Sequence, residues 1–173
     1  GTRHGVQHWS DGNHEERQTT FTEQRFHYLL TGEARTREWN RVLTEGWFLK
    51  EPCTVHAAHS GRSYGLLTRW EITGDAELGR TLREYMRALA TPEGIAISTP
   101  VGFPEGKATG PAKGLNEPNM FFHCFGGMHA MLEYVYLTGD EAVAASLQRA
   151  ADAALSPGSR GGAGDLLRKA VAY

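Results

Sequence analysis

Residues 116–155 read NEPNMFFHCFGGMHAMLEYVYLTGDEAVAASLQRAADAAL, and the pattern in this segment recurs along the chain. A mainly apolar run leads to Thr138-Gly139-Asp140, and a second segment with helical spacing of apolar residues follows. Glycine accepts the left-handed backbone conformation that ends one helix, and aspartate caps the free amides that begin the next. The segment therefore predicts an αα-hairpin.

The same turn occurs twice more, at Leu30-Thr31-Gly32-Glu33-Ala34 and at Ile72-Thr73-Gly74-Asp75-Ala76. A helix-turn-helix unit that repeats predicts stacked hairpins, which we expect at about residues 14–50, 57–90 and 119–155. The pattern predicts a single, incomplete all-α domain over residues 1–173, in which antiparallel αα-hairpin repeats form part of an (α/α) toroid or barrel.

The hairpins are unevenly spaced, because the threonines of the three turns are 42 and 65 residues apart. The longer interval contains a long inserted loop at residues 91–118, which is rich in Gly and Pro and in which residues 94–99 could form a short strand. A last helix at residues 165–173 follows a flexible Gly-rich connection and has no partner. An open array of this kind exposes apolar surface, so self-association through its open edge is expected.

Composition excludes several classes of function. The chain of 173 residues is 40% hydrophobic and 22% charged, as is usual for a globular domain, and its net charge is −2. Since Lys and Arg form no run, no electrostatic basis for nucleic-acid binding exists. No apolar stretch of membrane-spanning length and no signal peptide are found, and Cys53 and Cys124 fit no metal-binding spacing.

The orientation of the hairpins predicts where a site forms. If the three turns lie at one end of the array, the first, third and fifth helices all begin at the other end. Those beginnings are polar clusters at residues 8–18, 56–62 and 116–123. The even helices have one apolar stripe, whereas the fifth is apolar nearly all round, so we expect odd helices inside and even helices outside. The clusters would then meet at the mouth of a cleft.

Each cluster also has a plainer interpretation. His56 and His59 have a helical i, i+3 spacing that could hold a metal, but no nearby carboxylate completes a ligand set, and we predict no metal site there. His14 could cap a helix start or act on a substrate, and His123 could be a hydrogen-bonded core residue. Arg62 has a stronger claim, because a buried guanidinium needs a partner and could clamp a carboxylate.

The string His8-Trp9-Ser10-Asp11-Gly12-Asn13-His14-Glu15-Glu16-Arg17-Gln18-Thr19, together with the Leu-Thr-Gly-Asp hairpins and Asn119-Met120-Phe121-Phe122, resembles one family. It is similar to the central helical toroid domain of the exo-acting rhamnogalacturonan lyase-like proteins. That family is longer, with β-rich domains flanking the toroid, and this chain has about half the hairpins of a complete ring. The resemblance therefore implies a fragment or a truncated homologue, from a secreted or cell-envelope protein.

What the resemblance implies is β-elimination from an acidic, pectin-type glycan. Arg62 or Asn119 would neutralise the uronate carboxylate, His14 or His59 would be the base, and Tyr64 or another histidine the acid. A Ca²⁺ ion could replace the neutralising side chain. The residues expected to bind substrate are His8, Trp9, Asp11, Arg17, His56, Asn116, Asn119 and His123.

Two other functions fit the same scaffold. A glycoside hydrolase needs two carboxylates across the scissile bond, and the clusters offer Asp11, Glu15, Glu16 and Glu117. A non-catalytic helical-repeat module would instead recognise a protein or glycan on its concave face. Fold alone does not decide among these functions.

Overall fold

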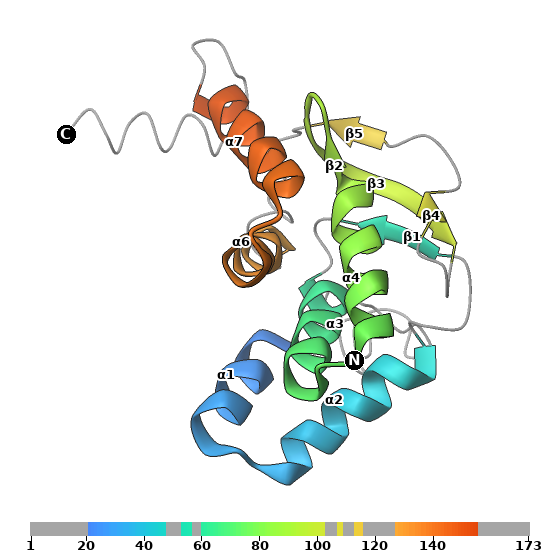
Figure 1. The fold of residues 1–173 in the computed structure, drawn as a ribbon, viewed down its shortest axis with the longest axis vertical. Helices are drawn as coiled ribbons and strands as arrows, with labels where there is room; N and C mark the ends of the chain where they lie inside the picture. The colour runs from blue at the N-terminus through green and yellow to red at the C-terminus, as the bar shows by residue number, and fades with distance from the viewer. Residues whose placement is uncertain are drawn as a thin grey trace, which may run out of the picture.

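The computed structural model describes residues 21–47, 53–56, 60–102, 107–108, 113–115 and 127–155 (Figure 1). Its helices are α1 (Phe21–Thr31), α2 (Ala34–Trp47), α3 (Ser60–Thr73), α4 (Ala76–Leu89), α6 (Gly127–Thr138) and α7 (Glu141–Leu155). Its strands are β1 (Cys53–His56), β2 (Ala90–Thr91), β3 (Gly94–Gly102), β4 (Lys107–Ala108) and β5 (Lys113–Leu115). The three helical hairpins confirm the predicted repeat architecture. The expected last helix at residues 165–173 lies outside the described residues.

The three hairpin turns have the same hydrogen-bonding pattern. In each turn the glycine has a positive φ, of 67°, 63° and 66° along the chain. The threonine hydroxyl before it donates to the carbonyl four residues earlier, at 2.7 to 2.8 Å, and accepts from the amide two residues later, at 3.2 to 3.3 Å. One short polar motif thus ends one helix and begins the next at each turn.

The residue after the glycine distinguishes the first turn from the other two. Asp75 and Asp140 each accept hydrogen bonds from two amides of the first turn of the next helix, at 2.8 to 3.4 Å. Glu33 has a longer side chain, and its carboxylate instead accepts from Thr36 at 3.0 Å and lies 2.9 Å from His27 Nε2. The predicted cap is therefore present where aspartate occupies the position.

Helix α3 is the centre of the helical part. It packs against α1 and α6, and also against α2 and α4 (Figure 1). We call α1, α3 and α6 the inner row, and this row agrees with the expectation that odd helices lie inside. Helix α4 has one buried face, formed by Leu78, Leu82, Tyr85, Met86 and Leu89 together with Thr81, as its apolar spacing predicts.

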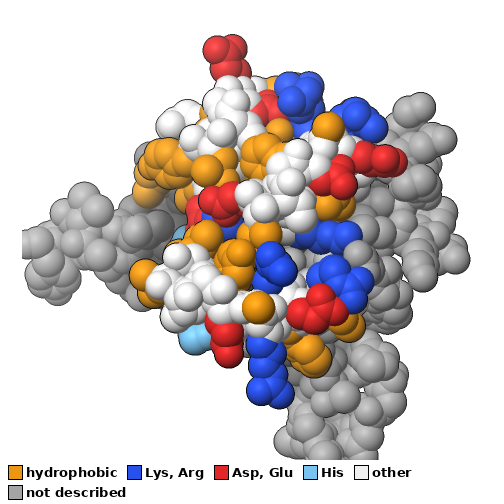
Figure 2. Space-filling view, turned by 60° about the horizontal axis from the view of Figure 1, so that its bottom comes forward, with side chains coloured by type: hydrophobic (Ala, Val, Ile, Leu, Met, Phe, Trp, Pro, Cys, Tyr) orange, Lys and Arg blue, Asp and Glu red, His pale blue; other side chains and the backbone are white. Residues whose placement is uncertain are grey.

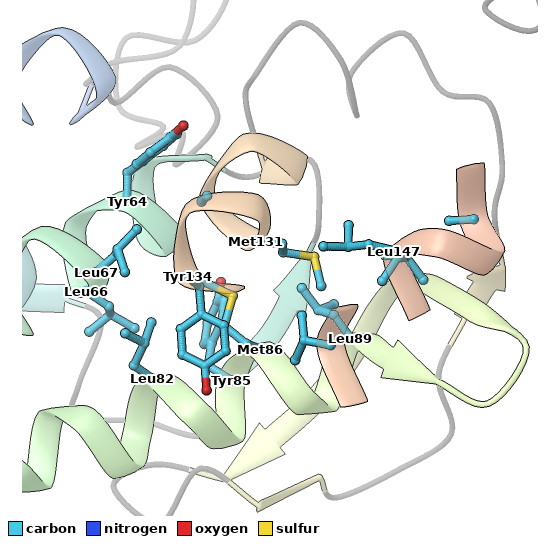
Figure 3. Packing of buried hydrophobic residues seen from close by; sticks show 14 of the residues in the cluster. Tyr64, Leu66, Leu67, Leu82, Tyr85, Met86, Leu89, Met131, Tyr134 and Leu147 are labelled. Atoms are coloured by element: carbon cyan, nitrogen blue, oxygen red, sulfur yellow. The ribbon is translucent and has the colours of Figure 1, made fainter. Parts of the chain in front are cut away.

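The hydrophobic core lies between α3, α4, α6 and α7 (Figure 3). Its largest fully buried side chains include Tyr85, Met86, Leu89 and Met131. Burying each such side chain stabilises the fold by about 1.5–3 kcal/mol relative to leaving it exposed. The second and third hairpins therefore share one core.

A small antiparallel sheet packs against α4 and α7 (Figure 1). Strand β3 is central and pairs with β1, β2, β4 and β5, and it also packs against α7. The strand expected at residues 94–99 is present and extends to Gly102. Strand β1 is a correction, because His56 was expected in the polar beginning of the third helix and lies in a strand. Val55 and His56 pair instead with Thr99 and Ser98 of β3.

The helices of the described segments are too short or too polar to cross a membrane. The longest of them, α7, has 15 residues. A membrane-spanning helix needs about 20 apolar residues.

Candidate functional site

A cluster of polar side chains lies where the three helices of the inner row meet. We call it the inner-row cluster, and its members are Arg25 of α1, Tyr64, Thr68 and Glu71 of α3, and Glu133 of α6. Buried polar groups are costly unless they are paired, so a connected cluster at this position needs an explanation in terms of structure or function.

Arg25 holds the inner-row cluster together. Its side chain is only 4% exposed, its Nε lies 2.9 Å from Glu133 Oε2, and its Nη1 lies 2.5 Å from Glu71 Oε2. The same Nη1 donates to the Thr68 hydroxyl at 3.3 Å. A guanidinium in this environment is stable because its donors meet acceptors on both neighbouring inner helices.

Tyr64 adds a second link from α3 to α6. Its hydroxyl donates to Glu133 Oε1 at 3.3 Å, and the side chain is buried. Figure 3 shows the hydroxyl pointing away from the apolar side chains of the core. Burial, and next the nearby Glu133 carboxylate, raise the pKa of Tyr64 far above its ordinary value. Tyr64 is therefore a neutral hydrogen-bond donor near neutral pH.

The inner-row cluster follows from the repeat. Arg25 stands seven residues before the turn glycine Gly32, while Thr68 and Glu133 stand six residues before Gly74 and Gly139. Three residues that are 43 and 65 positions apart in the chain thus lie at nearly the same level of their hairpins. Stacking of equivalent hairpins brings them together.

The carboxylates are the exposed part of the cluster. Glu71 and Glu133 are each about 30% exposed, whereas Arg25 and Tyr64 are buried. Two carboxylates and one guanidinium leave a formal charge of −1, so this end of the row favours a cationic or hydrogen-bond-donating ligand group. Among the described residues, no three His, Cys, Asp or Glu side chains are grouped to hold a metal ion.

A second polar group fixes the third hairpin against α4. Asp140 accepts hydrogen bonds from Arg87 Nε and from the Tyr134 hydroxyl, each at 2.9 Å. Burial acts to raise the pKa of Asp140, but the bonds from Arg87 and Tyr134 outweigh it, and the pKa lies below its ordinary value. Since Asp140 also caps α7, this group is structural.

A hollow of about 440 Å³ lies on the outer surface of the α1–α2 hairpin. It is lined by Gln24, Glu33, Arg35, Thr36, Glu38, Trp39 and Val42. Trp39 is half exposed there, and acidic and basic side chains alternate with apolar ones on the face shown in Figure 2. An exposed aromatic ring among hydrogen-bonding side chains can stack on an apolar ligand face while its polar neighbours bind ligand hydroxyls.

The structure describes few of the residues that the sequence singled out. Of those, His8, Trp9, Asp11, His14, Arg17, His59, Asn116, Asn119 and His123 lie outside the described residues. Arg62 lies in α3 and His56 in β1, where only their backbone is described. His56 ends strand β1, and since His59 is not described, the prediction made from their spacing stays a prediction. Tyr64 alone has a described side chain, and it joins the inner-row cluster.

Arg25, Glu71 and Glu133 were missed from the sequence. Their position along the inner helices could have found them, because residues at about the same distance from the turn glycine lie close together when the hairpins stack. Arg25 and Glu133 have opposite charges at nearly the same level, which predicts an ion pair between hairpins.

Comparison with known proteins supplies a family for the first part of the chain. Residues 1–46 match the family model described as the PcRGLX-like protein C-terminal alpha/alpha toroid domain. Residues 1–46 are therefore similar to this toroid domain, and the match covers about a quarter of the chain. This match confirms the resemblance inferred from the sequence, since it contains the whole segment His8 to Thr19. No curated protein and no solved structure matches the chain.

The part that matches the PcRGLX-like toroid includes α1 and nearly all of α2. Through Arg25, α1 is bonded to Thr68 and Glu71 of α3 and to Glu133 of α6. The family-matched hairpin is thus packed into the same inner row as the following hairpins.

Proposed function

We propose that this chain is a carbohydrate-active domain that cleaves an acidic, rhamnogalacturonan-type polysaccharide by β-elimination. One observation carries the proposal: residues 1–46 match the PcRGLX-like toroid, and Arg25 bonds the hairpin within that match to the two hairpins that follow it. The inner-row cluster has a formal charge of −1, so the surface proposed to bind the acidic polymer is instead formed by the polar helix beginnings at residues 8–18, 56–62 and 116–123.

The chemistry defines what the site must supply. β-Elimination needs a positive or hydrogen-bonding group to neutralise the uronate carboxylate, a base to remove the C5 proton and an acid to protonate the leaving oxygen. Arg62 or Asn119 is proposed for neutralisation, and His14 or His59 for the base. Arg25 does not suit neutralisation, because its guanidinium already bonds Glu71 and Glu133.

The contacts of Tyr64 bear on its proposed role as the acid. Its pKa is raised, so it keeps its proton near neutral pH, as an acid must. However, it is buried and its hydroxyl donates to Glu133, whose other oxygen faces Arg25. We therefore assign Tyr64 to positioning the partly exposed Glu133, and another histidine to protonating the leaving oxygen.

The test uses the protein with a rhamnogalacturonan-type polymer and follows two products. Elimination creates an unsaturated uronate that absorbs ultraviolet light, whereas hydrolysis creates reducing ends without that absorbance. The lyase predicts absorbance that is lost in His14→Ala or His59→Ala. Reducing ends without absorbance, lost instead when Glu15 or Glu117 is changed to Gln, would establish the hydrolase. Adding a Ca²⁺ chelator shows whether a cation assists.

A second candidate is a non-catalytic glycan-binding module, and the hollow on the α1–α2 hairpin favours it. Trp39 is exposed in that hollow beside Glu38, Gln24 and Arg35. This function predicts saturable binding of the polymer without turnover. Trp39→Ala should abolish that binding, whereas Arg80→Ala, an exposed change on α4, should leave it unchanged.

A further inference from the structure

One described histidine lies beside the inner-row cluster, on the side where α6 begins. His129 is in the first turn of α6, and its side chain is exposed. It precedes Glu133 by four residues, and residues at that spacing are neighbours on one face of a helix, with Cβ atoms about 5–6 Å apart. Side chains of a helix lean toward its beginning, so Glu133 leans toward the turn that contains His129. The imidazole and the carboxylate are therefore within reach of each other.

The repeat places His129 at the level of Tyr64. Tyr64 stands ten residues before Gly74, and His129 stands ten residues before Gly139. Tyr64 is buried and donates to Glu133, whereas His129 is exposed. Equivalent positions of two neighbouring inner helices thus supply a buried donor and an accessible imidazole around one carboxylate.

Glu133 is fixed well enough to orient an imidazole. Its Oε2 accepts from Arg25 Nε at 2.9 Å, and its Oε1 accepts from the Tyr64 hydroxyl at 3.3 Å. A carboxylate can accept about four hydrogen bonds, and this side chain is 29% exposed, so a further donor can approach it. The described bonds of Glu133 do not include one to His129, and bonds of this kind in catalytic sites often form only when substrate is bound.

We propose that His129 is the histidine that protonates the leaving oxygen, and that Glu133 orients its ring. This assignment rests on the proposed β-elimination. The base removes the C5 proton, the electron pair of that C–H bond forms the double bond between C4 and C5, and the bond from C4 to the leaving oxygen breaks with its electrons on the oxygen. Protonated His129 donates one ring proton to that oxygen and becomes neutral, while its other ring nitrogen donates to Glu133. Proton exchange with water then returns His129 and the base to their starting states.

The charge of the inner-row cluster suits the leaving side of the bond. The oxygen leaves with the neighbouring sugar, which is a neutral rhamnose in a rhamnogalacturonan. The formal charge of −1 on Arg25, Glu71 and Glu133 does not repel this sugar, whereas it would repel the uronate carboxylate. The carboxylate is bound instead at the helix beginnings, where Arg62 or Asn119 is proposed to neutralise it.

The first test compares His129→Ala with the unchanged protein and follows the unsaturated product from a rhamnogalacturonan-type polymer. His129→Ala should lower kcat at least about hundredfold, the usual contribution of a general acid, and change KM by less than about threefold. His27→Ala is the matched control, because His27 is the other histidine with a described side chain, is exposed, and pairs with Glu33 near the first hairpin turn. This control should keep the activity of the unchanged protein.

A substrate with a better leaving group separates an acid from other roles. A uronate that carries a nitrophenoxide at C4 needs no proton on its leaving oxygen, so His129→Ala should cleave it within about threefold of the unchanged protein. The visible absorbance of the released nitrophenolate measures this rate. A base, or a residue that only supports the fold, would leave His129→Ala slow on both substrates.

Glu133→Gln tests the positioning role. It should lower kcat on the polymer at least about tenfold, and the nitrophenoxide substrate should again recover the rate. Because Glu133 acts through His129, the double variant should be no slower than His129→Ala alone. Circular dichroism checks the fold, and Glu133→Asp replaces Glu133→Gln if that variant loses helix.

The outcomes separate this assignment from the elimination itself. An unchanged protein that gives no unsaturated product overturns the elimination, and this assignment with it. With an active unchanged protein, the assignment alone is overturned if His129→Ala keeps more than about a third of kcat or is slow on both substrates. An equal loss in His27→Ala also overturns it.

Discussion

Replacing Arg25 by Met tests whether the inner-row cluster stabilises the fold. The change keeps much of the side-chain volume but removes the bonds to Thr68, Glu71 and Glu133. Removing one partner of a buried ion pair costs about 3–5 kcal/mol. Glu71 and Glu133 keep partial contact with water, which reduces this cost, so we expect a loss of about 2–3 kcal/mol in the free energy of unfolding.

Urea unfolding followed by circular dichroism measures this loss for Arg25→Met. Arg35→Met is the matched control, because Arg35 is an exposed residue of the same hairpin, and we expect it to change stability by less than about 0.5 kcal/mol. Arg25→Lys should recover only part of the loss, since one ammonium cannot reproduce the planar guanidinium fork. If Arg25→Met is as stable as the control, the inner-row cluster does not hold the hairpins together.

Three further changes probe the other polar groups and the turns. Asp140→Asn weakens the hydrogen bonds from Arg87 and Tyr134, and it should destabilise the fold near neutral pH by about 1 kcal/mol, the usual contribution of one hydrogen bond. Because the folded pKa of Asp140 is depressed, its contribution to stability is present above its ordinary pKa of about 3.9 and is lost as pH falls below that value. The free energies of unfolding of the unchanged protein and of Asp140→Asn, measured with urea, should therefore converge in acid. Tyr64 has a raised pKa, so its contribution is full below its ordinary pKa of about 10 and is lost as pH rises above that value. In Tyr64→Phe this alkaline loss should be smaller, which stability measurements between pH 8 and pH 11 would show, and an unchanged profile would contradict it. Gly74→Ala should destabilise the fold by about 1–2 kcal/mol, because its φ of +63° is strained for any residue with a Cβ. Since no atom lies within 4 Å of the added Cβ, the strain is the whole cost, and an unchanged melting temperature would contradict this prediction.

The fold class was predictable because the turns are chemically explicit. All three copies of the turn place the threonine hydroxyl and a left-handed glycine in the same positions, and the two copies with aspartate also form the cap. The sheet was predicted only in part. Strand β3 has a β-like sequence, whereas β1 has just four residues and depends on pairing with residues about 45 positions away, which local propensity does not report.

The site was less predictable than the fold. Sequence reasoning looked for catalytic and binding side chains at the helix beginnings, and of all those candidates only Tyr64 has a side chain described in the structure. It passed over Arg25 and Glu133, which looked like solvated charges on amphipathic helices. Their pairing depends on which hairpin stacks on which, and the sequence of a single helix does not contain that information. When the three hairpins are aligned on their turn glycines, the number of residues before each glycine shows which positions meet.

The central place of α3 also sets an order for assembly. The α3–α4 hairpin is local in sequence, and its two helices contain eight of the core residues, so it can form a nucleus at little entropic cost. The first and third hairpins touch that nucleus on different sides, and Arg25 and Glu133 form a bond between them. The first and the third hairpin can therefore dock in either order, and the Arg25–Glu133 bond forms only when both are in place.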